Sequence, residues 1–68
     1  MNKAAFKYAL AKRNITQKQL AERLGVDENT VSNWVNGRTN VTLTTANRLC
    51  DVLGITDNDE KINIFFSD

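Results

Sequence analysis

Residues 17–36 read QKQLAERLGVDENTVSNWVN, and the order of apolar and polar residues in this stretch predicts two short helices. Leu20, Ala21 and Leu24 recur at helical spacing, so one stripe of the first segment is apolar. This stripe predicts a helix over about Gln17–Leu24, with its apolar side turned toward a core.

Residues that satisfy backbone groups mark both ends of this helix. Thr16 precedes it and Gln19 stands three residues later, which is the spacing of a capping box. Gly25 follows at the position where a left-handed residue ends a helix at little steric cost. Val26 can fill the space between two helices, and Asp27 is a candidate N-cap for the next one.

The second segment, about Glu28–Asn36, has one apolar and one polar face. Val31, Trp34 and Val35 share the apolar face, and Gly37 stops the helix. The opposite face carries polar side chains, namely Glu28, Asn29, Ser32, Asn33 and Asn36. Two helices joined by about three residues around a glycine are typical of a helix-turn-helix.

The side chains on the polar face are of types that can hydrogen-bond base edges in the major groove of DNA. Asn pairs with adenine N6 and N7, Glu accepts from cytosine N4, and Ser does either. A solvated helix surface is the alternative interpretation. We favour base reading, because Asn and Ser are mediocre helix formers and the face lacks the usual mixture of Lys and Glu.

Over about forty residues the pattern resembles the Cro/phage-repressor helix-turn-helix family, also called the xenobiotic-response-element type. The matching positions are Ile15-Thr16-Gln17, Leu20-Ala21, Leu24-Gly25-Val26, Thr30-Val31-Ser32, Trp34, Gly37-Arg38, Leu49 and Leu53-Gly54-Ile55. The resemblance covers roughly residues 5–56. It implies an all-α, compact, lambda-repressor-like domain of four to five helices, with the helix-turn-helix at helices two and three and the third helix reading DNA.

The resemblance also implies which residues contact DNA. It places base contacts at Glu28, Asn29 and Asn33, and with their neighbours the predicted base-reading set is Glu28, Asn29, Thr30, Ser32 and Asn33. Contacts to phosphates, which fix register without reading sequence, are predicted at Thr16, Gln17, Asn36, Arg38, Thr39 and Asn40. Relatives often carry Lys or Arg at the positions of Asn40 and Leu43, so we expect a shallow salt dependence here.

The chain before this motif reads as a first helix over Asn2–Arg13. Phe6, Ala9 and Leu10 form its apolar stripe, and Asn14 ends it because Asn tolerates the left-handed conformation. Many relatives carry Arg at the position of Leu10 and Glu at that of Val35, forming a buried ion pair. Both are apolar here, so we expect a hydrophobic contact in its place.

Two segments follow the motif. A fourth helix is predicted over about Leu43–Leu53, with Thr42 as its cap and an apolar repeat at Ala46, Leu49, Cys50 and Leu53. Residues 56–68 allow a short helix with Ile62, Phe65 and Phe66 on one face, or a strand in which Ile62, Ile64 and Phe66 alternate. We favour a helix that serves both the core and a dimer contact, the latter formed by Ile62, Ile64, Phe65 and Phe66.

Composition narrows the class of protein. At 68 residues the chain is expected to form a single domain, residues 1–68. With one cysteine, Cys50, and no histidine, we expect no internal disulfide, no metal site, no cofactor and no enzymatic activity. Both Cys50 and Trp34 are expected to be buried. The sequence contains no long apolar run, so we expect a cytoplasmic protein.

The net charge is only +1, but the charges are unevenly distributed. Residues 1–40 hold seven basic and three acidic residues, a balance of +4, whereas residues 41–68 hold two basic and five acidic residues, a balance of −3. This division fits a DNA-facing half and an opposite half, although ordinary surface charge gives the same pattern. Lys12, Arg13 and Lys18 add diffuse attraction to DNA or are simply solvated.

Two functions fit the sequence. The first is a DNA-binding transcriptional regulator, a repressor of phage or bacterial type that binds a pseudo-palindromic double-stranded operator as a homodimer. The alternative is a protein-interaction module of the same fold, an antirepressor or antitoxin, which binds a protein partner through the apolar segment Ile62–Phe66. Glu28 repels phosphate and mildly favours the alternative.

Overall fold

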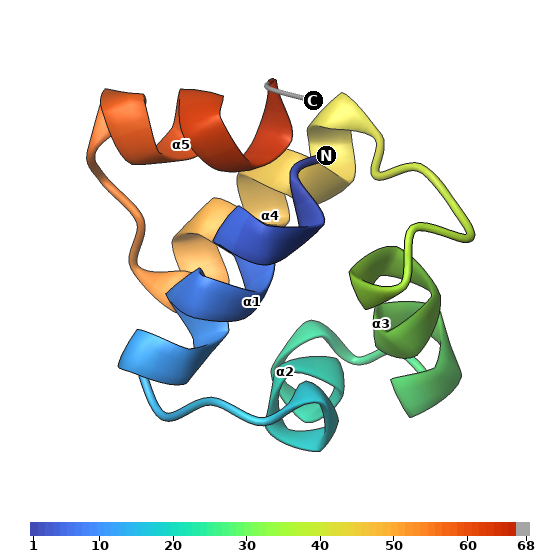
Figure 1. Cartoon of the computed structure of the whole chain (residues 1–68). Helices are drawn as coiled ribbons and strands as arrows, with labels where there is room; N and C mark the ends of the chain where they lie inside the picture. The colour runs from blue at the N-terminus through green and yellow to red at the C-terminus, as the bar shows by residue number, and fades with distance from the viewer. Residues whose placement is uncertain (67–68) are drawn as a thin grey trace.

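The computed structural model describes residues 1–66, which form five α-helices and no strand. In chain order these are α1 (Lys3–Lys12), α2 (Gln17–Leu24), α3 (Glu28–Val35), α4 (Leu43–Leu53) and α5 (Asn58–Phe65). Helix α1 packs against α3 and α5, and α2 packs against α3 and α4, so that the helices surround one core (Figure 1). The predicted all-α fold with a helix-turn-helix at the second and third helices is confirmed.

The link between α2 and α3 has the predicted local structure. The Gln19 backbone N–H donates to Thr16 Oγ1 over 3.1 Å, and the Thr16 backbone N–H donates to Gln19 Oε1 over 3.0 Å, which completes the capping box. Gly25 is left-handed, with a φ of 72°. The Asn29 backbone N–H donates to Asp27 Oδ1 over 3.3 Å and caps α3. These local bonds set the turn through which α3 leaves α2.

Two predicted helices are shorter in the structure because their end residues act as caps. Asn2 precedes α1 and its Oδ1 accepts from the Ala5 backbone N–H over 3.1 Å, while Arg13 is the C-cap. Asn14 then adopts the predicted left-handed conformation, with a φ of 55°. Asn36 is likewise the C-cap of α3 and not its last helical residue.

The core is apolar and draws on all five helices. Its fully enclosed large side chains are Phe6, Leu20, Val31, Leu49 and Ile64. Leu10 and Val35 lie in the same cluster, as expected from the apolar residues that replace the family's ion pair. Trp34 and Cys50 are also buried, as predicted. Burial raises the pKa of the Cys50 thiol, so the sulfur stays protonated and unreactive near neutral pH.

The C-terminal segment is a helix, so the strand alternative is wrong for the described residues, and α5 is oriented differently from the prediction. Ile64 is 1 % exposed, whereas Ile62 is 53 % and Phe66 65 % exposed. Phe65 turns partly inward and its ring lies 6.5 Å from that of Phe6. The expected dimer contact through Ile64 is therefore incorrect, because the monomer core already encloses this side chain. Residues 67–68 of the predicted segment lie outside the described residues.

A polar cluster that the sequence did not reveal ties α5 to α1 and α4. Arg13 donates to both carboxylate oxygens of Glu60, over 3.1 and 3.3 Å, and Lys12 Nζ lies 2.8 Å from the same carboxylate. Arg13 Nε also donates over 2.7 Å to the carbonyl of Leu53, the last residue of α4. The hydrogen bonds from Arg13 and Lys12 lower the pKa of Glu60. Both cations thus serve the fold, and neither is a freely solvated charge.

Candidate nucleic-acid interface

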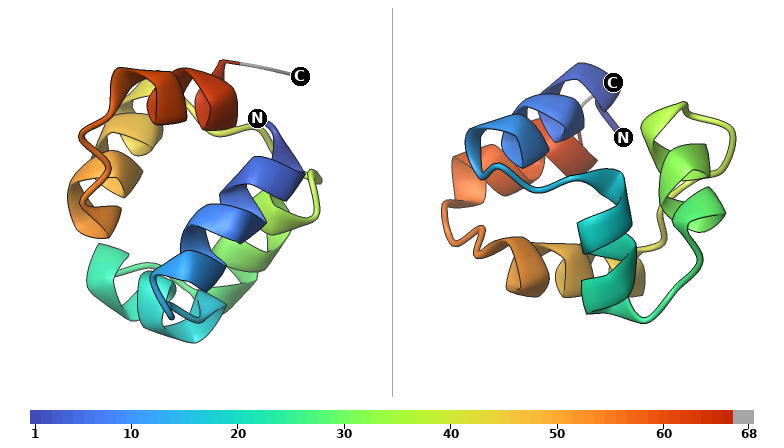
Figure 2. Two further views of the ribbon diagram at one scale, coloured as in Figure 1. Left: turned by 60° about the vertical axis from the view of Figure 1, so that its left-hand side comes forward. Right: turned by 90° about the horizontal axis from the view of Figure 1, so that it is seen from below.

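Helix α3 lies at the edge of the molecule with its apolar side turned inward. The right-hand view of Figure 2 shows α3 at the periphery beside α2. Val31, Trp34 and Val35 are 0 %, 8 % and 3 % exposed, so they fix the rotation of the helix about its axis. Because the direction of side chains on an α-helix repeats every 3.6 residues, the face opposite these three residues must point away from the core.

This outward face carries the predicted base-reading residues. Glu28 and Asn29 are exposed, and Thr30, Ser32 and Asn33 are half-buried at the surface. The helical repeat puts Asn29 and Asn33 side by side opposite the core, with Thr30 and Glu28 on the two flanks. The structure brings all five residues onto one accessible surface, as a helix inserted into a major groove requires.

The end of α3 carries an internal hydrogen bond that changes the expected role of Asn36. Its side-chain amide donates to the Ser32 carbonyl over 2.9 Å and lies 3.2 Å from Ser32 Oγ. The amide of Asn36 is therefore largely committed to its own helix. Ser32 Oγ accepts in this contact, which leaves its hydroxyl proton available as a donor to a base.

The start of α2 offers donors to an anion. The first N–H groups of a helix lack intrahelical acceptors, and the capping box satisfies that of Gln19 but not those of Gln17 and Lys18. The Thr16 hydroxyl accepts from Gln19 and retains a proton to donate. Backbone N–H groups at a positive helix end suit a phosphate oxygen.

The loop after α3 offers a second set of donors. Residues 36–40 are all exposed. The N–H groups of Gly37 and Arg38 donate to the carbonyls of Trp34 and Asn33, over 3.1 and 2.9 Å. Among the described residues, the N–H groups of Thr39 and Asn40 have no acceptor, and Arg38 forms no ion pair. This loop extends from the C-terminal end of α3, and α2 lies beside α3 (Figure 1).

Comparison with known proteins agrees with this geometry. A helix-turn-helix family model matches residues 6–59, which run from α1 into α5. The chain belongs to the Cro/phage-repressor type of helix-turn-helix proteins. This is a family of DNA-binding transcription regulators. Comparisons with curated proteins and with solved structures gave no match. None of the helices in residues 1–66 has the length and apolar character needed to cross a membrane.

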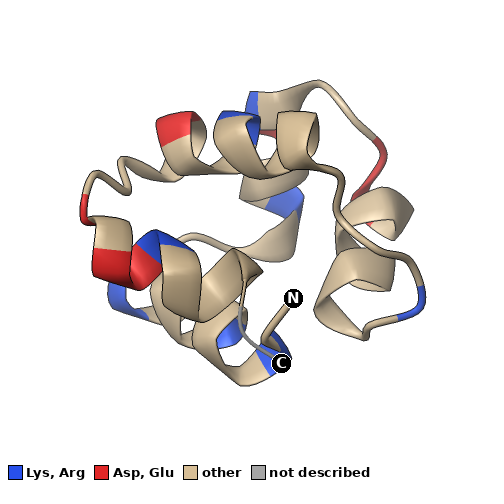
Figure 3. Ribbon diagram, turned by 90° about the horizontal axis from the view of Figure 1, so that it is seen from above, with Lys and Arg blue, Asp and Glu red and all other residues tan. Residues whose placement is uncertain are grey.

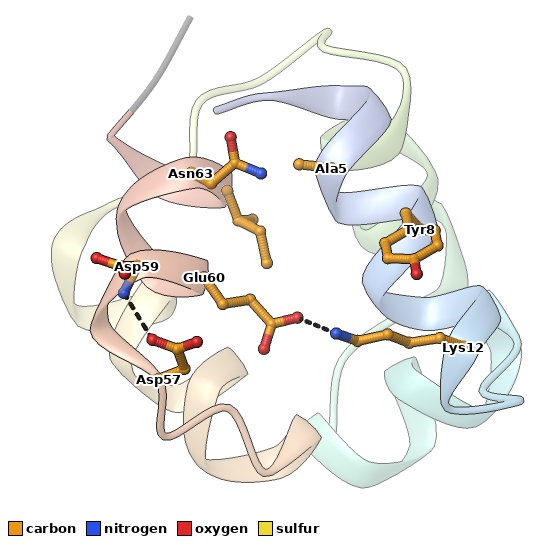
Figure 4. Close-up of a pocket in the computed structure, with 8 residues that line it drawn as sticks. Ala5, Tyr8, Lys12, Asp57, Asp59, Glu60 and Asn63 are labelled. Carbon is orange, nitrogen blue, oxygen red and sulfur yellow. Dashed lines mark hydrogen bonds and ion pairs between the residues drawn. The ribbon is translucent and has the colours of Figure 1, made fainter.

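A hollow in the described part of this helix-turn-helix protein lies away from α3. It has a volume of about 400 Å³ and opens between α1 and α5, with Tyr8 and Lys12 on one wall and Asp57, Asp59 and Glu60 on the other (Figure 4). The Lys12–Glu60 ion pair spans it. The start of α5 is acidic, and it lies on the far side of the molecule from α3 (Figure 3). Carboxylates on this wall disfavour a nucleic-acid phosphate, so we do not assign the hollow to DNA.

Sequence reasoning missed one residue that supports the helix-turn-helix. Arg48 Nη2 donates over 2.8 Å to the carbonyl of Leu24, the last residue of α2. The Leu24 carbonyl lies in the last turn of α2, where carbonyls have no N–H donor within the helix. The bond from Arg48 supplies that donor and ties the end of α2 to α4. No spacing rule connects residues 24 positions apart, so no pattern in the sequence pointed to it.

Proposed function

We propose that this protein is a sequence-specific transcriptional repressor of phage or bacterial type, which binds a pseudo-palindromic operator as a homodimer with α3 in the major groove. One observation carries the proposal. Val31, Trp34 and Val35 lock one side of α3 into the core, and the opposite side presents the amides of Asn29 and Asn33. A rigidly held, amide-bearing helix at the molecular edge suits base reading.

Each residue on the outer face has a distinct part in this proposal. Asn29 and Asn33 bind adenine through N6 and N7, and Glu28 accepts from cytosine N4. Ser32 donates its free hydroxyl proton to a base, and the methyl group of Thr30 contacts that of a thymine. The Glu28 carboxylate also repels phosphates, so its burial at the interface lowers affinity unless a cytosine amine donates a hydrogen bond to it.

Two donor sets position α3 on the backbone. The N–H groups and hydroxyl at Thr16 and Gln17 bind one phosphate, and Arg38, Thr39 and Asn40 bind another across the groove. Asn36 contributes less than the sequence suggests, because its amide is bonded to Ser32. Only one of these six residues is a cation, so the salt dependence of the contacts is shallow.

A dimer follows from the small number of base contacts that one domain offers. Two α3 helices must lie about 34 Å apart to enter successive major grooves on one side of DNA. The described domain measures 28 × 22 × 21 Å, so a pair of domains in contact is large enough to span this separation. The exposed Ile62 and Phe66, with the half-buried Phe65, form the dimer contact. A dimer of this kind represses by covering promoter DNA.

Selection of operators from a random duplex library tests base reading. We expect the wild-type protein to enrich a sequence with twofold symmetry. Asn29→Ala and Asn33→Ala should each lower affinity for it by about 1–3 kcal/mol, or about 5- to 150-fold, without lowering affinity for random duplex. Asn63→Ala is the matched control, because Asn63 is an exposed asparagine on α5, and it should bind normally. No enrichment by the wild-type protein, or normal binding by both α3 variants, would contradict the proposal.

The apolar surface on α5 also fits a protein-interaction module, and a second experiment separates the two functions. Light scattering should show that Phe66→Asp weakens self-association on the operator, whereas Asn63→Asp, which adds the same charge nearby, does not. If the wild-type protein is monomeric with and without operator, the exposed Ile62 and Phe66 instead mark a heterologous protein partner, as in an antirepressor or antitoxin.

A further inference from the structure

A small crevice joins the beginning of the chain to the loop after α3. Its volume is about 180 Å³, and it is lined by Met1, Lys3, Trp34, Gly37, Thr39 and Asn40. We propose that this crevice binds a DNA phosphate and that Lys3, on α1, supplies its cation. The inference rests on the proposed function and adds to it a contact from outside the helix-turn-helix.

Gly37 allows Lys3 to reach the loop. Gly37 is left-handed, with a φ of 70°. A Cβ atom at this position would lie 2.9 Å from Lys3 Cδ and 3.5 Å from Lys3 Nζ. The lysine side chain therefore lies against the bare backbone of Gly37, in space that any other residue would fill. This contact holds the ammonium group beside the exposed loop.

The crevice presents donors and no carboxylate. Lys3 Nζ, the Thr39 hydroxyl and the Asn40 amide all belong to its lining residues. The backbone N–H groups of Thr39 and Asn40 have no acceptor among the described residues. A water molecule takes about 30 Å³ in the liquid, so the space holds a phosphate oxygen together with water. A donor-rich crevice beside α3 selects for an anion.

The charge of Lys3 is free to serve a ligand. Both ion pairs within residues 1–66 involve Glu60, so Lys3 has no carboxylate within ion-pair distance there. The segment from Asn36 to Thr42 contains a single cation, Arg38. Lys3 therefore doubles the positive charge available along the edge where α3 meets the backbone of DNA.

Salt dependence of binding tests the proposal, because it counts charged phosphate contacts. Fluorescence anisotropy with the selected operator and with a random duplex measures how the association constant falls with salt concentration. Lys3→Gln should make the plot of log K against log salt shallower by about 0.9. Affinity for both duplexes should fall by a similar factor, and Lys3→Arg should restore the slope. Circular dichroism should show that the variants are folded, because Lys3 is exposed.

Lys7→Gln is the charge-matched control. Lys7 is exposed one turn farther along α1 and does not line the crevice, so its loss should leave the slope unchanged. An unchanged slope for Lys3→Gln, or an equal loss for Lys7→Gln, overturns the inference while leaving base reading intact. If the wild-type protein binds no duplex, both proposals fail.

A free phosphate ion could occupy the crevice in place of a DNA phosphate, and a titration with inorganic phosphate tests this alternative. Inorganic phosphate should shift the amide resonances of Thr39 and Asn40 in the wild-type protein less than the operator duplex does. Saturation by inorganic phosphate at low concentration, combined with a normal DNA salt slope for Lys3→Gln, assigns the crevice to a free anion and overturns the DNA contact.

Discussion

Helices α3 and α5 are built alike, but they present opposite chemistry to their surroundings. Each has eight residues and is preceded by an N-cap aspartate whose carboxylate accepts the backbone N–H two residues later. The outer side of α3 carries the amides of Asn29 and Asn33, whereas that of α5 carries Ile62 and Phe66. The same local design thus provides a surface for base edges in one place and a surface for an apolar partner in another.

The two helices are also attached to the molecule in different ways. Three buried side chains, Val31, Trp34 and Val35, hold α3. Helix α5 buries only Ile64, and it is further held by the ion pairs of Glu60 and by the partly buried Phe65. The Ile64 carbonyl also accepts from the Asn2 backbone N–H over 2.7 Å. We infer that α3 is fixed by packing, while α5 depends on few apolar contacts and on polar contacts with α1 and its caps.

The largest effect is expected at the single buried residue of α5. Ile64→Ala should lower the free energy of unfolding by about 2–5 kcal/mol, because it leaves a cavity where a fully enclosed side chain was. Ile62→Ala removes the same atoms from an exposed position and should change it by less than about 0.5 kcal/mol. Urea unfolding followed by circular dichroism measures both values. Equal losses would show that the inward face of α5 has been misassigned.

The sequence predicted α3 well because local rules fix it almost completely. Thr16, Gln19, Gly25 and Asp27 act within their own turn, and the apolar stripe gives the rotation of each helix. Both the exposed and the buried face of α3 follow from these rules. The candidate site could therefore be outlined from sequence, apart from the bond between Asn36 and Ser32, which competes with a DNA contact.

The rotation of α5 could not be predicted in the same way. Ile62, Ile64, Phe65 and Phe66 cover almost every direction around a short helix, so the apolar residues define no single stripe. The choice is made by distant residues. Arg13, which is 47 positions away, bonds to Glu60, and the Asn2 backbone N–H donates to the Ile64 carbonyl. Lys3 and Gly37 meet for the same kind of reason, since only the fold brings α1 to the loop.

An intermediate effect is expected from the charged attachment of α5. Glu60→Gln should lower the free energy of unfolding near neutral pH by about 1 kcal/mol, because a paired but partly solvated carboxylate loses its charge. The pKa of Glu60 is lowered in the folded state, so its contribution is fully present above the ordinary pKa of a glutamate and is lost as pH falls through the lower folded value.

The pH profile separates this charge from packing. The stability difference between wild type and Glu60→Gln should shrink toward zero in acid, as thermal unfolding across pH values would show. Asp51→Asn is a useful control, because Asp51 is exposed on α4 and forms no ion pair among the described residues. A difference for Glu60→Gln that persists unchanged in acid would mean that shape, and not charge, attaches α5.

The smallest effect on stability is expected at the two capping aspartates, where the comparison is most direct. Asparagine caps a helix as well as aspartate does, so Asp27→Asn and Asp57→Asn should each lose only the charge–dipole interaction, about 0.3–1 kcal/mol.

The effects of these two substitutions on DNA binding should differ. Asp27 stands at the start of α3, where its charge repels phosphate, so Asp27→Asn should raise operator affinity and steepen the salt dependence. Asp57 is the N-cap of α5 and lines the hollow on the far side, so its substitution should leave operator affinity and salt dependence unchanged. Anisotropy titrations of the two variants at several salt concentrations give the answer. If both variants behave alike on DNA, α3 is no nearer the phosphates than α5 is, and the proposed assignment of these two surfaces is wrong.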